Sequence, residues 1–123
     1  MMKTFAQALL LTLVCGTLYG QDLAGQWQGA LHVQGTELRI VFNIEKTNDL
    51  YKATMDSPDQ NVTGTLVTHA SLSHPNVKFE IANSGIVYEG EMIDNVIYGK
   101  WMQSGTWLFL KLAKSGGLPD RKK

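Results

Sequence analysis

After Asp22 the chain consists of short stretches in which apolar and polar residues alternate, and this pattern constrains the fold more than any other feature. Gly, Asn, Asp and Ser recur between the stretches, and no segment keeps a helical period. Such a succession of strands and turns predicts an all-β protein. We expect a compact antiparallel up-and-down β-barrel of about eight to ten strands, because closing the sheet removes its exposed edges.

The register of each hairpin can be tested, because a slip of one residue turns every side chain to the wrong face. Gly35-Thr36 suits a two-residue turn with Gly first. This turn predicts that Leu31 lies opposite Ile40 and that Val33 lies opposite Leu38. Apolar residues then meet apolar residues on one face of the hairpin.

Two further turns share the strand between them. A turn at Asp94-Asn95 places Tyr88 opposite Trp101, and a turn at Ser104-Gly105 places Trp101 opposite Leu108. Both turns put Trp101 on the inner face. This agreement supports the predicted register of the C-terminal part of the sheet.

The middle of the chain gives weaker signals. Tyr51, Ala53 and Met55 are predicted to face inward. Residues 61–73 read as a bent or broken strand in which Gly64 allows the bend. His74-Pro75 is predicted to form the next turn.

The first residues are typical of a signal peptide. Lys3 precedes an apolar run over 5–14, and Gly20 offers a small residue for cleavage. The run is too short to span a membrane, so we expect export to the periplasm or beyond the cell. A lipid anchor on Cys15 is the weaker alternative, because Val14 is larger than the residue such processing favours. The predicted division is a signal peptide at 1–20, a barrel domain at 21–113 and a flexible basic tail at 114–123.

Charge and motifs exclude several functions. Basic and acidic residues balance at 11 each, and no basic stripe suggests nucleic-acid binding. There is no Gly-x-Ser-x-Gly motif. His32, His69 and His74 are not placed to converge on a metal. We therefore expect no catalytic residues, no metal and no cofactor.

Four segments carry a family likeness. The sequences GQWQGAL, LRIVFNIEK, YKATMDSPDQ and IYGKWMQSGTWLFLKL resemble the small β domain that precedes bacterial α/β-hydrolase and serine-hydrolase domains. In those proteins the following hydrolase domain holds the catalytic residues, and this chain ends at Lys123. The resemblance therefore implies an exported, non-catalytic accessory or binding domain. Gly25-Gln26-Trp27 also resembles, more weakly, the Gly-x-Trp strand of lipocalin-like barrels.

The segment Asp56-Ser57-Pro58-Asp59-Gln60 has two interpretations. As the most specific piece of the resemblance, it is a candidate contact loop through Asp56, Asp59 and Gln60. The alternative is a Pro-containing turn in which the Asp side chains accept hydrogen bonds from local amides, and the composition favours this alternative.

The run from Trp107 to Leu110 breaks the alternation of the last strand. If Leu108 and Leu110 face inward, Trp107 and Phe109 face outward, and Met102 and Tyr98 join them from the neighbouring strand. A contiguous exposed apolar patch usually marks a contact, so we expect a protein partner or self-association here. Alternatively, the C-terminal tail or the chain before Trp27 covers these residues.

The interior offers a second functional hypothesis. Trp27, Tyr88 and Trp101 face inward together with Gly90 and Gly99. The missing side chains of the glycines could open a cavity, as in a lipocalin-like carrier of a small apolar ligand. They could equally permit the coiling that barrel closure needs, and a filled core is the commoner outcome.

Overall fold

The structure is a computed structural model, and it describes residues 22–115. The predicted signal peptide and residues 116–123 of the predicted tail lie outside this part. The strands are β1 (Gly25–Val33), β2 (Thr36–Thr47), β3 (Leu50–Ser57), β4 (Val62–Val67), β5 (His69–Ser73), β6 (Asn76–Ile81), β7 (Ile86–Ile93), β8 (Val96–Gln103) and β9 (Thr106–Lys114), with short 3-10 helices η2 (Pro58–Gln60) and η3 (Ala82–Ser84).

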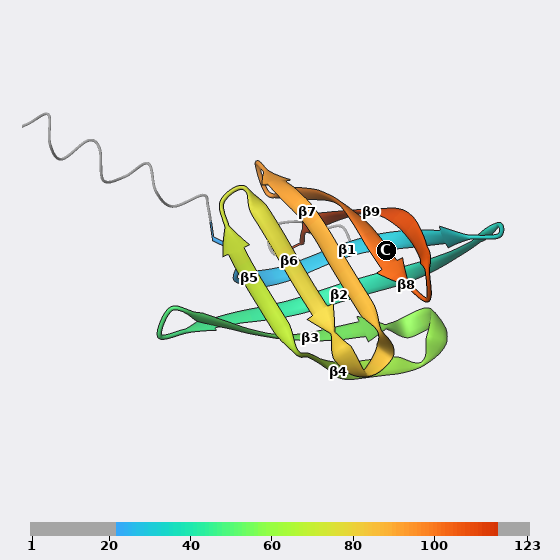
Figure 1. Cartoon of the computed structure of the whole chain (residues 1–123), viewed down its shortest axis with the longest axis horizontal. Helices are drawn as coiled ribbons and strands as arrows, with labels where there is room; N and C mark the ends of the chain where they lie inside the picture. The colour runs from blue at the N-terminus through green and yellow to red at the C-terminus, as the bar shows by residue number, and fades with distance from the viewer. Residues whose placement is uncertain (1–21, 116–123) are drawn as a thin grey trace, which may run out of the picture.

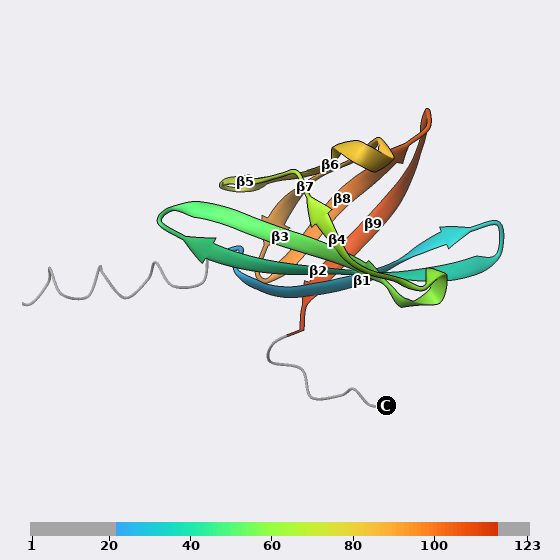
Figure 2. The same ribbon diagram turned by 90° about the horizontal axis from the view of Figure 1, so that it is seen from below.

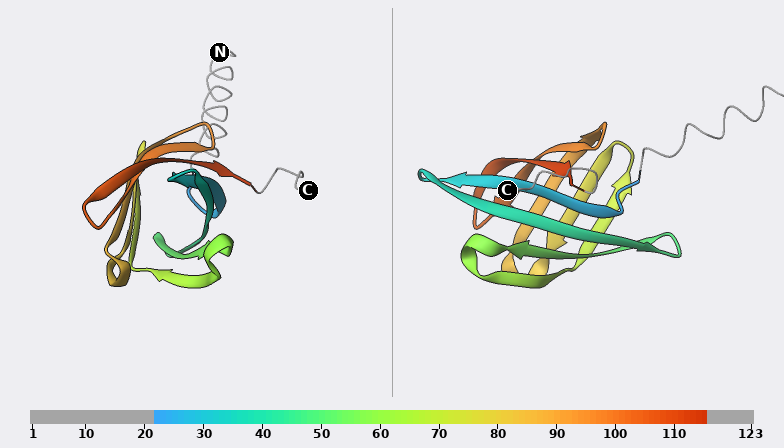
Figure 3. Two further views of the ribbon diagram at one scale, coloured as in Figure 1. Left: turned by 90° about the vertical axis from the view of Figure 1, so that its right-hand side faces the viewer. Right: turned by 180° about the vertical axis from the view of Figure 1, so that it is seen from behind.

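The strands form one antiparallel sheet of nine strands in the order β4-β3-β2-β1-β9-β8-β7-β6-β5 (Figure 1). Strands adjacent in sequence pair with each other except β4 and β5, and β1 also pairs with β9. The sheet curls round so that its two ends, β4 and β5, come together, as the view along the barrel shows (Figure 3, left). This nearly closed, up-and-down β-barrel confirms the predicted fold class.

The C-terminal hairpins have the predicted register. Tyr88 lies opposite Trp101, and Trp101 lies opposite Leu108. The turn at Asp94-Asn95 has positive φ at both residues (50° and 64°), as a type I′ turn requires. Turn chemistry and the apolar pattern therefore agree on one register in β7–β9.

The first hairpin corrects the prediction. Its turn is Gln34-Gly35 rather than Gly35-Thr36, and Leu31 lies opposite Leu38. Both turn residues have positive φ (50° and 83°), so Gln34 takes a conformation that Asn or Gly more often supplies. The observed register differs from the predicted one by two residues. Because this number is even, the same side chains face the interior as predicted.

The predicted bent or broken strand is broken at Thr68, while Gly64 lies in the part of β4 where the register with β3 shifts. The backbone N–H of Thr68 donates to the Glu80 carbonyl (2.7 Å), and its Oγ1 accepts a hydrogen bond from the Ala82 N–H (2.7 Å). Thr68 thus fixes the corner where the chain passes from β4 to β5. Gly64 has a positive φ of 71° within β4.

The barrel interior is packed with apolar side chains. Phe42, Phe79 and Tyr88 form an aromatic cluster whose ring centroids lie 4.5 to 6.3 Å apart. The Tyr88 hydroxyl donates to the Leu110 carbonyl (2.7 Å), and burial raises the pKa of Tyr88 well above its ordinary value. Its polar group is therefore satisfied inside the core.

One end of the barrel is closed by residues next to β1 and β9. Leu23 is fully buried, and its carbonyl accepts a hydrogen bond from Trp27 Nε1 (2.8 Å). Lys114 Nζ lies 5.4 Å from the centroid of the Trp27 ring and donates to the Asp22 carbonyl (3.2 Å). The Ser115 N–H donates to the Gln26 carbonyl (2.8 Å). The end of β9 is thus joined to the start of β1 (Figure 2).

Candidate functional site

Four predicted residues form what we call the aromatic surface: Tyr98 and Met102 on β8, and Trp107 and Phe109 on β9. Met102 lies opposite Trp107 across the two strands. Phe109 is 72% exposed, Tyr98 51% and Trp107 50%. Because regular pairing on β8 fixes the direction of these side chains, they are presented on the outside of the barrel by a rigid element.

The two exposed rings of β9 pack against each other. The Trp107 and Phe109 centroids lie 5.1 Å apart with an interplanar angle of 83°, an edge-to-face arrangement. Lys100 lies opposite Phe109 in register, yet its Nζ is placed over Trp107, 4.6 Å from the ring centroid. The two rings thus contact each other, Lys100 covers Trp107, and Phe109 is left open to solvent.

A shallow hollow adjoins the aromatic surface. Its volume is about 550 Å³, and its lining residues are Asn76, Glu89, Gly90, Glu91, Tyr98, Gly99, Lys100 and Phe109. Rings lie on one side, and the carboxylates of Glu89 and Glu91 lie on the other. The geometry combines apolar anchoring points with a charged rim, as at the centre and edge of protein interfaces.

Asp59 of the candidate contact loop is bound to β2. It accepts hydrogen bonds from the backbone N–H of Arg39 (2.8 Å), from Arg39 Nε (3.2 Å) and from Arg39 Nη2 (3.0 Å). The side-chain hydrogen bond from Arg39, and then its backbone N–H, hold the pKa of Asp59 below its ordinary value. Asp59 thus holds η2 against β2.

Asp56 and Gln60 are also used within the molecule. Asp56 accepts hydrogen bonds from Asn43 Nδ2 (3.0 Å) and from the Gly64 N–H (2.7 Å). Gln60 Nε2 donates to Ser57 Oγ (2.8 Å), and the buried Ser57 hydroxyl donates to the Arg39 carbonyl (3.0 Å). The segment therefore fastens β2, β3 and β4 together, and most partners of its Asp side chains lie on β2 rather than among the local amides that the turn interpretation assumed.

The inward glycines accommodate close packing. A Cβ added at Gly99 would lie 2.6 Å from Tyr88 Cζ and 2.7 Å from its hydroxyl oxygen. At Gly90 it would lie 2.7 Å from the Tyr98 carbonyl oxygen. Trp27, Tyr88 and Trp101 are all buried. The Tyr88 ring thus fills the space that the missing side chain of Gly99 leaves.

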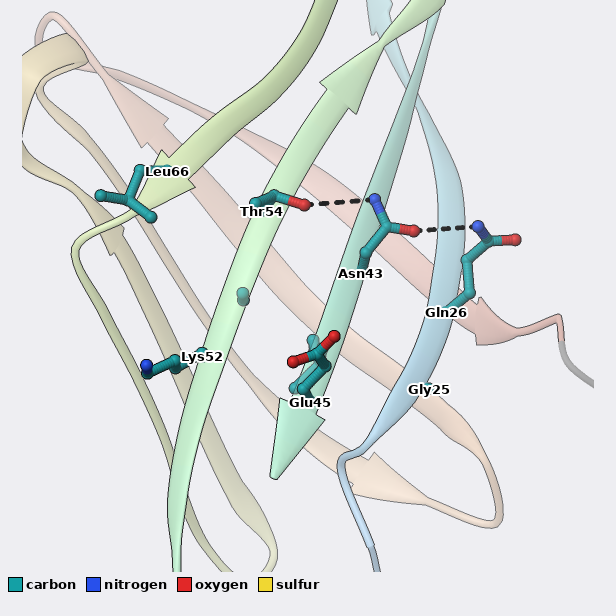
Figure 4. Close-up of a pocket in the computed structure, with 9 residues that line it drawn as sticks. Gly25, Gln26, Asn43, Glu45, Lys52, Thr54 and Leu66 are labelled. Carbon is teal, nitrogen blue, oxygen red and sulfur yellow. Dashed lines mark hydrogen bonds between the residues drawn. The ribbon is translucent and has the colours of Figure 1, made fainter. Parts of the chain in front are cut away.

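A second hollow, of about 410 Å³, lies on the outer side of β1–β3 (Figure 4). Gln26 Nε2 donates a hydrogen bond to Asn43 Oδ1 (2.9 Å), and Asn43 Nδ2 donates one to Thr54 Oγ1 (3.4 Å). Sequence reasoning missed this polar row, although the outward register of Gln26, Asn43 and Thr54 was a usable signal. Because the amides bond one another, the row chiefly joins neighbouring strands.

The histidines do not converge on a common centre. His32 Nδ1 lies 3.7 Å from a carboxylate oxygen of Glu37, and both side chains are well exposed. His69 and His74 are exposed at the two ends of β5. Within residues 22–115 no three His, Cys, Asp or Glu side chains are grouped to hold a metal ion.

Within the same described range, no helix has the length and apolar character needed to cross a membrane.

Comparisons with models of protein families, with curated proteins and with solved structures found no match to this chain.

Proposed function

We propose that this protein is an exported, non-catalytic binding domain that engages a protein partner through the aromatic surface. The observation that carries the proposal is the ordered pair of exposed rings, Trp107 and Phe109, at the place where the strand pattern breaks. The resemblance to domains that precede hydrolases supports an accessory role, with an exported hydrolase as a candidate partner.

The energetics of burial support this site. Covering one large aromatic side chain contributes a few kcal/mol at about 25 cal/mol per Å² of apolar surface. Trp and Tyr are also frequent energetic centres of interfaces. Trp107 and Phe109 are fixed against each other and by Lys100, so little side-chain entropy remains to be lost on binding.

The packing of the interior supports an external site over the alternative of a carrier. A small apolar ligand inside the barrel would need the space that Tyr88 occupies over Gly99. Displacing the Tyr88 ring would also remove its hydroxyl from the Leu110 carbonyl. Such a buried group is costly to leave without a partner.

The proposal can be tested with a double variant, Trp107→Ser/Phe109→Ser. Protein complexes would be isolated with the native chain from the cells that make it and quantified by mass spectrometry. A matched control is Leu50→Ser/Leu66→Ser, because these two apolar residues are also strongly exposed but lie on β3 and β4.

We expect the aromatic variant to lose its partner while the control keeps it. The free energy of unfolding of the aromatic variant should change by at most about 1 kcal/mol, as for exposed positions. Equal recovery of the partner with both variants would refute the proposal, and so would unfolding of the aromatic variant, which would identify the rings as core.

A further inference from the structure

A pair of glutamates on β7 lies beside the aromatic surface. The strands β6–β9 lie side by side in Figure 1, and antiparallel pairing aligns their outward side chains in rows that cross the strands. Glu91 lies opposite Tyr98 of β8. Glu89 lies in the neighbouring row, which ends at Phe109 of β9. Two carboxylates and two rings therefore border the hollow of about 550 Å³ described above.

Two lysines of β8 and β9 lie near this hollow without neutralising the glutamates. Lys100 lies opposite Glu89 in register, but its amine is placed over the Trp107 ring. Lys111 lies opposite Tyr98, one strand further from β7. Among the described residues, neither lysine forms an ion pair. The β7 carboxylates are therefore not paired from the side of the aromatic surface.

On the side of β6, one lysine is shared between two carboxylates. Lys78 Nζ lies 3.2 Å from a carboxylate oxygen of Glu80 and 3.8 Å from one of Glu89. Glu91 lies opposite the uncharged Asn76 and, within residues 22–115, forms no ion pair. The hollow therefore has an excess of negative charge next to its rings.

We propose that the hollow binds an arginine side chain of the partner protein, next to an apolar residue of the partner that covers Phe109. This assignment rests on the proposed function, because it names the chemistry of the partner that the aromatic surface binds. A guanidinium group is planar, so it can stack on an aromatic ring while its N–H groups donate to carboxylates. Tyr98 and Phe109 supply the rings, and Glu89 and Glu91 supply the acceptors.

Charge and stacking should both be needed for binding. The side chain of Glu89 is 56% exposed, and an ion pair at an exposed position contributes little by itself. The rings add the burial of the apolar stem of arginine and contact with its planar head. A lysine ammonium is compact and strongly hydrated, so it should bind here more weakly than arginine.

Amide NMR spectra of the purified chain test this assignment without the partner. The probe is acetyl-Leu-Arg-amide, added up to about 20 mM at low ionic strength, where exposed charges are least screened. The comparison probe is acetyl-Leu-citrulline-amide, which has nearly the same shape but no charge. We expect saturable shifts of the amide signals of residues 89–91 and 98–100 with the arginine probe. The citrulline probe should bind about tenfold more weakly.

Charge variants identify the groups that bind the probe. Glu89→Gln/Glu91→Gln should lower the affinity for the arginine probe by about tenfold. Glu37→Gln/Glu45→Gln is the matched control, because it removes two exposed glutamates of β2, and it should bind as the native chain does. Lys78→Gln should bind the probe about two- to threefold more tightly, because it removes the amine that competes for Glu89.

Equal binding of the two probes, or unchanged binding in Glu89→Gln/Glu91→Gln, would overturn the assignment. The glutamate variant also enters the isolation of protein complexes that tests the aromatic surface, where we expect it to lose most of the partner. If Trp107→Ser/Phe109→Ser loses the partner while the glutamate variant keeps it, the arginine assignment fails and the proposed function stands. Recovery of the partner with the aromatic variant would instead refute the proposed function.

Discussion

Gly99 shows how a single residue decides between a filled and a hollow barrel. It lies on the inner face of β8 opposite Gly90 and directly below the Tyr88 ring. The ring takes the place of a side chain, and the Tyr88 hydroxyl reaches the Leu110 carbonyl on β9. The glycine therefore permits close packing rather than creating a cavity.

Replacing Gly99 by Ala should destabilise the protein by about 1–3 kcal/mol, because the new methyl group overlaps the Tyr88 ring and the Glu89 carbonyl oxygen. Urea unfolding measures the change. Gly105→Ala is the comparison, since nothing lies near its added methyl group and only its positive φ of 78° is unfavourable, at about 1 kcal/mol. A Gly99→Ala protein as stable as the native one would indicate free space in the interior.

A second prediction concerns the contribution of the Asp59 carboxylate to stability. Its pKa in the folded protein is lowered by hydrogen bonds from Arg39, so it stabilises the fold above its unfolded pKa of about 3.9. This contribution is lost as pH falls through the lower folded pKa. Asp59→Asn should therefore be less stable than the native chain at pH 7, and the difference should narrow below about pH 4. Urea unfolding at both pH values measures it, and a pH-independent difference would contradict the assignment.

Among the elements, the β7–β8 hairpin depends on the residues of its turn. Asp94 and Asn95 both have positive φ, which suits a type I′ turn. Asn95→Val should lower the free energy of unfolding by about 1–3 kcal/mol, because a β-branched residue is strained there. Asn95→Gly should cause no loss. Thermal unfolding of the two variants compares them, and equal stabilities would show that the turn does not depend on this residue.

How much could be predicted also differs among elements. Asp94-Asn95 and Ser104-Gly105 gave the correct register of β7, β8 and β9 because local turn preferences and apolar alternation agreed. The register predicted for the first hairpin was wrong by two residues, because Gln34 has a positive φ, a conformation that glutamine rarely adopts. Thr68 could not be recognised as the corner, because its hydrogen bonds reach Glu80 and Ala82, which are distant in sequence.

For the candidate site, the sequence predicted which side chains face outward but not which contacts they make. Periodicity along β9 placed Trp107 and Phe109 outside, as the structure has them. It could not determine that Lys100 covers Trp107 and leaves Phe109 open, since this is a choice among side-chain conformations. Nor could it join Asp59 to Arg39, because that pairing depends on how η2 lies against β2.

At the scale of the whole molecule, the two halves of the sheet are joined between β1 and β9 by few backbone pairs. Only Trp27 with Lys114 and Gln28 with Ala113 pair between β1 and β9. The remaining attachment comes from Lys114 to the Asp22 carbonyl and from Ser115 to Gln26. Hydrogen bonds from Lys114 and Ser115 thus add to the two backbone pairs between β1 and β9.

Truncation before Lys114 should therefore destabilise the barrel. A chain ending at Ala113 loses one of the two β1–β9 pairs, the amine over Trp27 and the bonds of Ser115. We expect a loss of about 2–4 kcal/mol in the free energy of unfolding, measured by urea denaturation. A chain ending at Ser115 is the control and should match the full chain; equal stability of the two truncations would show that this closure is unimportant.

We propose that the protein acts from the outside of a filled barrel, through the aromatic surface. Site-specific photo-crosslinking in the cells that make the protein tests it most directly. A photoreactive phenylalanine analogue would replace Phe109 in one chain and Leu50, an exposed residue on β3, in another. We predict a discrete protein adduct from position 109 that Trp107→Ser removes, and no such adduct from position 50. The same adducts from both positions, or no adduct from position 109, would refute a binding site at the aromatic surface.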